Sequence, residues 1–232
     1  MNIKHAMILA AGLGTRMQPL TSKTPKPLIK IGNKNLLERS ISLLEKHGVE
    51  QIIINVHHLA DQIENFISNY HSKSNIMISS EKDLLLDTGG GVKKGTKQFE
   101  ENPFFVINPD TLWFNNYSNE IKSLENIYYR YNKPCLLLVN KKLSFDKSFK
   151  GDFNLNDNKV SKNLENNFIF TGLQILNRNN LDFINKKVFS MNEVWTQLIK
   201  DRNLYGFEST QKFYHLNTDK IYKKISNLTV TD

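Results

Sequence analysis

The chain has 232 residues, of which 39% are hydrophobic and 23% charged, so it is long enough for one domain with a buried core. Its net charge is +8, but no basic stripe with interleaved aromatic residues stands out, so nucleic-acid binding is not expected. The apolar run at residues 6–11 is too short to cross a bilayer and lacks a cleavage site, so neither a membrane span nor a signal peptide is expected there. Cys135 is the single cysteine, which excludes an internal disulfide and favours a cytoplasmic location.

The first half of the chain alternates short apolar runs with helical patterns. The runs predict strands, and the 3.6-residue patterns between them predict helices. The expected strands are 6–11, 51–56, 75–80, 103–108 and 135–139, and the expected helices are 36–44 (with Gly48 as its C-cap), 59–70, 88–99 and 117–131. Such alternation indicates βαβ units and a mainly parallel sheet, in which ligands bind at the carboxyl ends of the strands.

The second half is richer in strands. It predicts a hairpin of 152–155 with 159–161, strands at 168–176, 204–207 and 213–216, and helices at 191–202 and 218–227. We therefore expect an α/β fold: a Rossmann-like, mainly parallel mixed sheet flanked by helices, with a small strand-rich lobe.

A turn of small residues follows the first predicted strand. Its members are Ala11, Gly12, Leu13, Gly14, Thr15 and Arg16. Small residues let the backbone approach an anion, and their N–H groups can form a phosphate-binding concavity. The guanidinium of Arg16 can donate two hydrogen bonds to phosphate oxygens. This turn is therefore a candidate phosphate loop.

Two other phosphate-binding motifs do not fit this loop. The dinucleotide fingerprint needs a glycine where Met17 stands, and the Walker A motif needs a Gly-Lys-Ser/Thr that does not follow. Instead, Lys26 stands between Pro25 and Pro27, whose restricted backbone holds the lysine extended and can aim its ammonium.

Two further motifs also follow predicted strands. Asp87-Thr88-Gly89-Gly90-Gly91 opens a helix with glycines, which allow a flat ligand to lie against the backbone. Asn108-Pro109-Asp110 delivers one carboxylate at the end of a strand. Mg²⁺ prefers oxygen ligands and accepts one or two carboxylates together with phosphates, so a carboxylate at this place is compatible with a metal ion.

The combination of Gly12-x-Gly14-Thr15-Arg16 with Pro25-Lys26-Pro27 resembles the signature of the nucleotide-diphospho-sugar pyrophosphorylases. The resemblance covers nearly the whole chain and is strongest to single-domain N-acetylmuramate-1-phosphate uridylyltransferases and mannose-1-phosphate guanylyltransferase-like proteins. It implies the nucleotide-diphospho-sugar transferase fold. It also implies one domain, 1–232, with a nucleotide-binding half at 1–140 and an acceptor-binding half at 141–232.

The resemblance also implies roles for the nucleotide-binding residues. Ala11, Gly12, Gly14, Thr15, Arg16 and Lys26 would hold the NTP phosphates, and Thr88, Gly89 and Gly90 would read the base. Arg16, Lys26 and Asp110 would be catalytic, with Mg²⁺ on Asp110. Asn55, His57 and His58 follow a strand and can flank the nucleotide or be structural.

The acceptor side is implied by weaker similarities. Asp152, Thr171, Gly172, Asn192 and His215 would contact the acceptor, while Trp195 fits a substrate wall and a core position equally well. His215 stands where many relatives have a second metal-binding Asp. A neutral imidazole is a poor Mg²⁺ ligand, so one or two metal ions both stay open.

The expected reaction joins an NTP to a sugar 1-phosphate and releases pyrophosphate. UTP with N-acetylmuramate 1-phosphate, or with a similar amino-sugar 1-phosphate, is the first hypothesis. GTP with mannose 1-phosphate and CTP with phosphocholine or a phosphonate are alternatives within the enzyme class. A non-catalytic module that senses nucleotides or sugar phosphates is the alternative outside it. Whether the chain is a monomer or a homodimer stays open.

Overall fold

The computed structural model describes residues 2–99 and 102–228. In this part of the chain, nine strands form one mixed sheet in the order β5-β4-β1-β6-β10-β7-β11-β9-β8. Its strands are β1 (His5–Leu9), β4 (Gln51–Val56), β5 (Asn75–Ser80), β6 (Phe104–Ile107), β7 (Cys135–Asn140), β8 (Asn154–Asn156), β9 (Lys159–Ser161), β10 (Phe168–Leu176) and β11 (Tyr205–Ser209). A separate hairpin pairs β2 (Lys30–Ile31) with β3 (Lys34–Asn35).

The strands of the first half are parallel to one another. β1 lies between β4 and β6 and is parallel to both, and β5 continues the parallel set at the edge. β10 is antiparallel and joins β6 to β7, while β11 is parallel to β7. The expected mainly parallel mixed sheet is therefore confirmed, and it runs without a break from the first half of the chain into the second.

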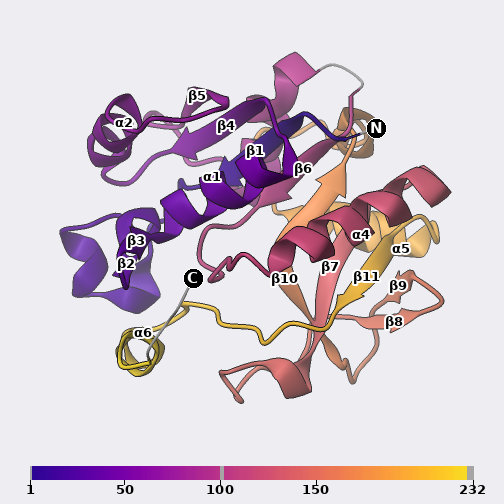
Figure 1. Ribbon diagram of the computed structural model, residues 1–232. Coiled ribbons are helices and arrows are strands. Elements are labelled where there is room, and N and C mark those ends of the chain that lie inside the picture. Colours follow the sequence, from indigo (N-terminus) through magenta and orange to yellow (C-terminus); the bar gives the residue numbers. More distant parts are fainter. Residues whose placement is uncertain (1, 100–101, 229–232) are drawn as a thin grey trace.

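Helices cover both faces of this sheet (Figure 1). The helices are α1 (Leu36–His47), α2 (Ala60–Ser68), α3 (Asp87–Gly95), α4 (Tyr117–Tyr131), α5 (Met191–Lys200) and α6 (Asp219–Ser226). On one face α1, α2 and α4 pack against strand residues such as Ile8 and Ile54. On the other face α3 and α5 pack against their neighbours Met7 and Ile53. Neighbouring residues of one strand thus belong to different cores, which explains why these strands read as unbroken apolar runs.

Local capping marks both ends of α1 and the start of α5. Asn35 accepts a hydrogen bond from the backbone N–H of Glu38 at the start of α1, and Gly48 ends that helix in the left-handed region, as expected. Ser190 and Glu193 form a capping box at the start of α5. This cap holds the first turn of α5 beside the carboxyl end of the sheet.

One expected strand is wrong. Residues 213–216 are extended but form only isolated bridges, from Thr111 to His215 and from Ser144 to Phe213. The Leu112 N–H donates to the Tyr214 carbonyl and the Leu216 N–H to the Asp110 carbonyl, so the segment runs along the loop after β6 instead of joining the sheet. The expected helix 88–99 ends at residue 95 and continues as a 3-10 turn, Thr96–Phe99.

The last helix packs beside the region that follows β1. Ile221 and Ile225 of α6 share a core with Met17, Ile29 and Ile31, and Figure 1 shows α6 next to β2 and β3. The C-terminal part of the described chain therefore supports the predicted phosphate loop. None of the described helices combines the length and the apolar character that a membrane span requires.

Candidate active site

The loop after β1 is held in shape from within. Gly14 has φ +65°, and a Cβ there would come within 2.9 Å of the Thr21 methyl carbon. The Thr21 hydroxyl donates a hydrogen bond of 2.7 Å to the Gly14 carbonyl. Only glycine fits this left-handed, crowded position without strain. Gly12 differs, because a Cβ there would meet nothing within 4 Å.

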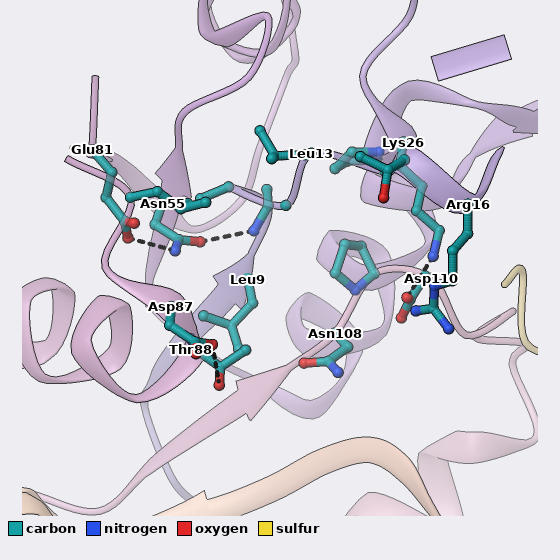
Figure 2. A pocket seen from close by; sticks show the side chains of 18 of the residues that line it. Leu9, Leu13, Arg16, Lys26, Asn55, Glu81, Asp87, Thr88, Asn108 and Asp110 are labelled. Atoms are coloured by element: carbon teal, nitrogen blue, oxygen red, sulfur yellow. Dashed lines mark hydrogen bonds and ion pairs between the residues drawn. The ribbon is translucent and has the colours of Figure 1, made fainter. Parts of the chain in front are cut away.

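This loop borders a cavity of about 610 Å³ at the carboxyl ends of β1, β4 and β6. Its volume is in the range of sites for nucleotide-sized ligands. The predicted site residues that line it are Ala11, Gly12, Gly14, Thr15, Arg16, Lys26, Thr88 and Asp110. Figure 2 shows Arg16, Lys26 and Asp110 on one side of the cavity and Asn55 with Glu81 on the opposite side.

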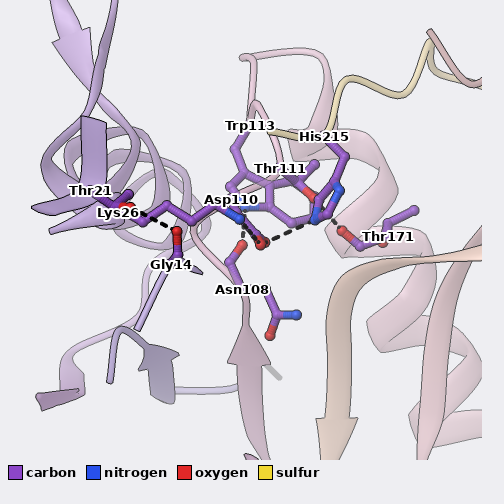
Figure 3. Close-up of polar contacts among 9 residues, drawn as sticks. All are labelled: Gly14, Thr21, Lys26, Asn108, Asp110, Thr111, Trp113, Thr171 and His215. Atoms are coloured by element: carbon purple, nitrogen blue, oxygen red, sulfur yellow. Dashed lines mark hydrogen bonds and ion pairs between the residues drawn. The ribbon is translucent and has the colours of Figure 1, made fainter. Parts of the chain in front are cut away.

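Lys26 and Asp110 are 84 residues apart in the chain but meet in this cavity. The Lys26 ammonium lies 2.7 Å from Asp110 Oδ2, and the side chains are 14% and 20% exposed. His215 Nε2 lies 3.1 Å from the same oxygen (Figure 3). Burial would by itself raise the pKa of Asp110, but the charges of Lys26 and His215 outweigh it and hold that pKa far below its ordinary value. The carboxylate therefore stays ionised.

The second oxygen of Asp110 is suited to a metal ion. Asp110 Oδ1 is buried and has no hydrogen-bond partner in the described part of the chain. Buried carboxylate oxygens are normally bonded, so this atom points to a ligand that the protein alone does not supply. Within residues 2–99 and 102–228, no group of three or more His, Cys, Asp and Glu side chains surrounds a possible ion position. One carboxylate completed by phosphate oxygens matches how proteins hold Mg²⁺.

The glycine run at the start of α3 has a different environment from the one expected. A Cβ on Gly89 would lie 2.4 Å from the Phe189 ring, and one on Gly90 would lie 2.2 Å from the Lys187 carbonyl oxygen. Both glycine N–H groups donate to the Phe189 carbonyl. These glycines let the 187–189 segment pack closely on α3. Contact of Gly89 and Gly90 with a base stays a prediction, although Thr88 beside them does line the cavity.

A buried carboxylate that the sequence analysis missed forms the far wall. Glu81 is 2% exposed and accepts hydrogen bonds from the Asn55 amide at 2.7 Å and the Leu86 N–H at 2.9 Å. Asn55 in turn accepts from the Ala10 N–H at 2.8 Å, at the start of the phosphate loop. Glu81 directly follows β5, so its place at a strand's carboxyl end was the signal that could have identified it.

The two histidines after β4 bind backbone instead of lining the cavity. A ring nitrogen of His57 lies 2.7 Å from the Glu81 carbonyl, and a ring nitrogen of His58 lies 3.0 Å from the Thr21 carbonyl. They connect the ends of β4 and β5 and the segment after the phosphate loop. Of the two roles considered for these histidines, flanking the nucleotide or holding the structure, the structural role accounts for both side chains.

A second cavity of about 170 Å³ adjoins the first. The two share the lining residues Leu9, Asp87, Thr88 and Asn108. Its other walls come from β10 and the start of α5, and they include the predicted acceptor residue Asn192.

The other predicted acceptor residues lie outside the described lining of both cavities. The Asp152 carboxylate accepts from the Phe170 N–H, and the buried Thr171 hydroxyl donates to the Leu137 carbonyl. Gly172 has φ +96° and lets Asn108 approach, since a Cβ there would lie 2.9 Å from the Asn108 Cβ. His215 contacts Asp110. Their contact with an acceptor stays a prediction.

Comparison with known proteins places this site in a family. Residues 5–136, more than half of the chain, match the family model described as nucleotidyl transferase. The chain belongs to the nucleotidyl transferase family. This match contains the predicted phosphate loop, Lys26, the glycine run and Asp110. Together with the relatives below, it confirms the resemblance to the sugar-nucleotide pyrophosphorylases.

Two curated relatives in the nucleotidyl transferase family differ in the substrates that their names give. The chain is 42% identical over 113 residues to the N-acetylmuramate alpha-1-phosphate uridylyltransferase of Caulobacter vibrioides, and the aligned residues cover 47% of each protein. It is 30% identical over 213 residues to a mannose-1-phosphate guanyltransferase of Gibberella zeae, and the aligned residues cover 87% of this chain and 57% of that protein. The chain therefore matches about half the length of these relatives.

Solved structures confirm the nucleotide-diphospho-sugar transferase fold. A UDP-glucose pyrophosphorylase complexed with UDP-glucose superposes with a TM-score of 0.81 at 18% identity and covers 97% of both chains. HddC from Yersinia pseudotuberculosis superposes with a TM-score of 0.71 at 25% identity and covers 96% of this chain and 98% of its own. The nucleotidyl transferase fold therefore extends over both halves of the described chain.

Proposed function

We propose that this protein is a sugar-1-phosphate nucleotidyltransferase that transfers a nucleoside monophosphate from an NTP to a sugar 1-phosphate and releases pyrophosphate. The observation that carries the proposal is the meeting of Lys26 and Asp110 beside the loop of Gly12 to Arg16, in a cavity of nucleotide size. The second cavity, which adjoins it through Leu9, Asp87, Thr88 and Asn108, supplies room for an acceptor.

The chemistry needs alignment and charge neutralisation more than a base. A phosphate oxygen of the acceptor, already anionic, attacks the α phosphorus of the NTP and forms a new P–O bond. The bond from the α phosphorus to the pyrophosphate oxygen breaks, and the leaving group takes its electron pair. Arg16 and the N–H groups of the loop bind the departing phosphates, and Lys26 neutralises charge around the α phosphate.

We include Mg²⁺ in this proposal, held by Asp110. Its free oxygen, Oδ1, is the ligand that the chain offers, while Oδ2 stays on Lys26 and His215. When bound, the ion would supply positive charge next to the phosphates. The Lys26 contact orients the carboxylate and holds the ammonium in the cavity.

For the substrates we propose UTP and an amino-sugar 1-phosphate, with N-acetylmuramate 1-phosphate first. The 42% identity to the uridylyltransferase of Caulobacter vibrioides supports this choice. GTP with mannose 1-phosphate is the second candidate, because the match to the guanyltransferase of Gibberella zeae spans more of the chain. We place the reaction in the cytoplasm, in keeping with a single, buried and unpaired cysteine.

Pyrophosphate release tests the proposal directly. The purified chain with Mg²⁺ is assayed with UTP, GTP, CTP, ATP and dTTP, each against a panel of sugar 1-phosphates. Turnover with UTP and N-acetylmuramate 1-phosphate would support both the proposed reaction class and the proposed substrates. Turnover with another pair would support the reaction class and change the substrates. Silence with every pair, together with tight NTP binding in calorimetry, would contradict it and favour a nucleotide-sensing module.

A further inference from the structure

Part of the lining of the second cavity is apolar, beside the polar residues Ser190 and Asn192 at the start of α5. The apolar part consists of Leu9, Phe170, Met191 and Trp195, and the rings of Phe170 and Trp195 meet edge to face with centroids 4.9 Å apart. In the described part of the chain its lining contains no lysine, arginine or histidine, and its one acidic residue, Asp87, is shared with the first cavity. Without a cation to bind a phosphate, the cavity suits an uncharged group with an apolar part, unlike the first cavity with Arg16 and Lys26.

One amide is fixed in this wall by the tryptophan. The Trp195 indole N–H donates a hydrogen bond of 2.9 Å to Gln174 Oε1, and the bond is buried. An indole nitrogen can only donate, so it determines which end of the Gln174 amide is oxygen. The amide nitrogen is therefore oriented away from the indole, with its two hydrogens in fixed directions.

The Gln174 nitrogen is available to a ligand. Within residues 2–99 and 102–228 this nitrogen makes no hydrogen bond. It is also not one of the fully enclosed polar atoms, so it keeps some contact with the cavity. Gln174 itself is only 2% exposed and lines the cavity. A mostly buried amide normally bonds at both ends, so a free donor here points to an acceptor atom brought by a substrate.

We propose that Gln174 and Trp195 make this cavity a subsite for the acetamido group of an N-acetylated sugar 1-phosphate. This inference rests on the proposed function and names the structural feature of the acceptor that the site selects. The Gln174 N–H donates to the acetamido carbonyl, and the methyl group packs against the apolar wall of Met191, Phe170 and Trp195. Trp195 is the positioning residue, because its indole N–H holds the amide in the donating orientation.

A purely structural role would not need this arrangement. Two apolar side chains would fill the space between β10 and α5 without a buried amide, whose desolvation costs free energy. Phe153 already packs on Trp195, with ring centroids 5.7 Å apart. The polar pair is therefore explained best by a ligand carbonyl on its open side.

The test compares two acceptors that differ only at C2, N-acetylglucosamine 1-phosphate and glucose 1-phosphate. The readout is the ratio of their kcat/KM values, with the NTP that supports turnover. The wild-type ratio should be at least about 10, because a site built to hydrogen-bond a group discriminates against an analogue that lacks it. A wild-type ratio of one or less would overturn the inference.

Three variants locate the effect. Gln174→Glu replaces the donor by an oxygen that repels the carbonyl, and it should lower the ratio by about 10–100-fold with little change on glucose 1-phosphate. Gln174→Met removes the donor without adding a charge and covers the case in which the glutamate variant does not fold. Trp195→Phe keeps an aromatic ring but releases the amide, so the ratio should fall by a smaller factor.

The control is Gln197→Glu, which places the same change on the outer side of α5. Gln197 donates to Asp201 and does not line the cavity, so its variant should keep the wild-type ratio. Equal slowing of both acceptors in Gln174→Met would show a structural role and refute the subsite.

Direct binding separates this inference from the proposed function. If no pair of substrates releases pyrophosphate, the proposed function fails, and calorimetry with the two sugar 1-phosphates then decides the subsite. Tighter binding of N-acetylglucosamine 1-phosphate that Gln174→Met abolishes would support it. Equal affinities for the two sugars would overturn it.

Discussion

Two glycine-containing turns lie at the same edge of the sheet, and their glycines face different neighbours. In the turn after β1, Gly12 has open space where a side chain would be and lines the large cavity. In the first turn of α3, Gly89 and Gly90 face the backbone and ring of the 187–189 segment at distances that no Cβ tolerates. The first turn leaves space for a ligand, and the second is filled by the chain itself.

This difference shows what glycine does and does not indicate. In both turns it permits a close approach, but the partner is decided by what the second half of the chain places there. The phosphate-loop region is further organised by charge, through Lys26, Asp110 and His215. The α3 region is organised by packing against Phe189 and its neighbours. Changes of charge should therefore act at the first region, and changes of volume at the second.

The largest effect is expected from removing the ammonium of the first region. Lys26→Ala should lower kcat/KM for pyrophosphate release by about 10²–10³-fold, because a positive charge beside the α phosphate is lost. The thermal midpoint should also fall, because Asp110 loses the ammonium that offsets its buried charge, so activity is measured well below that midpoint. Lys23→Ala, a neighbouring exposed lysine that does not line the cavity, is the control and should keep full activity. Near-normal turnover of Lys26→Ala would remove Lys26 from the mechanism.

The next largest effect is expected from adding a negative charge to the same region, and it is measured as a change in the stability of the protein. His215→Asp places a second carboxylate beside Asp110, and like charges at close range oppose each other unless a cation lies between them. With EDTA the variant should lose about 1–3 kcal/mol of stability relative to the wild type, and Mg²⁺ should restore most of it. Thermal unfolding of both proteins, with and without Mg²⁺, measures this. A midpoint that ignores the metal would show that Asp110 does not bind it.

A volume change at the second region should act on folding. Gly90→Ala puts a methyl group 2.2 Å from the Lys187 carbonyl oxygen, so α3 or the 187–189 segment must move. We expect a loss of about 1–3 kcal/mol, seen as a lower midpoint in thermal unfolding. An unchanged midpoint combined with weaker nucleotide binding would contradict the packing role and support a glycine that faces the base.

The smallest change in stability is expected from the matching substitution in the first region. Gly12→Ala adds a methyl group to open space, so the midpoint should shift by no more than about 0.5 kcal/mol of stability. The methyl group enters the cavity, and nucleotide affinity in calorimetry should fall by roughly tenfold, about 1.4 kcal/mol. If Gly12→Ala destabilised the protein as much as Gly90→Ala, the contrast between the two turns would be lost.

Prediction from the sequence succeeded where the signal is local. Strand alternation, apolar runs and caps such as Gly48 predicted the sheet and its helices because they depend on neighbouring residues. The acceptor side was harder to predict, since Asp152 and Thr171 use their polar groups within the sheet. Gln174 faces the second cavity from the same strand as Thr171, and nothing in its neighbours distinguishes the two roles.

The sequence by itself determined the α/β architecture and predicted the phosphate loop, with Gly14 and Lys26 as parts of one motif. Only the tertiary structure decided that Lys26 meets Asp110, that Glu81 holds Asn55 and that Trp195 orients Gln174. The physical reason is range. Periodicity and capping act over a few residues, whereas these contacts join segments between 21 and 84 positions apart and depend on how the strands are ordered in the sheet.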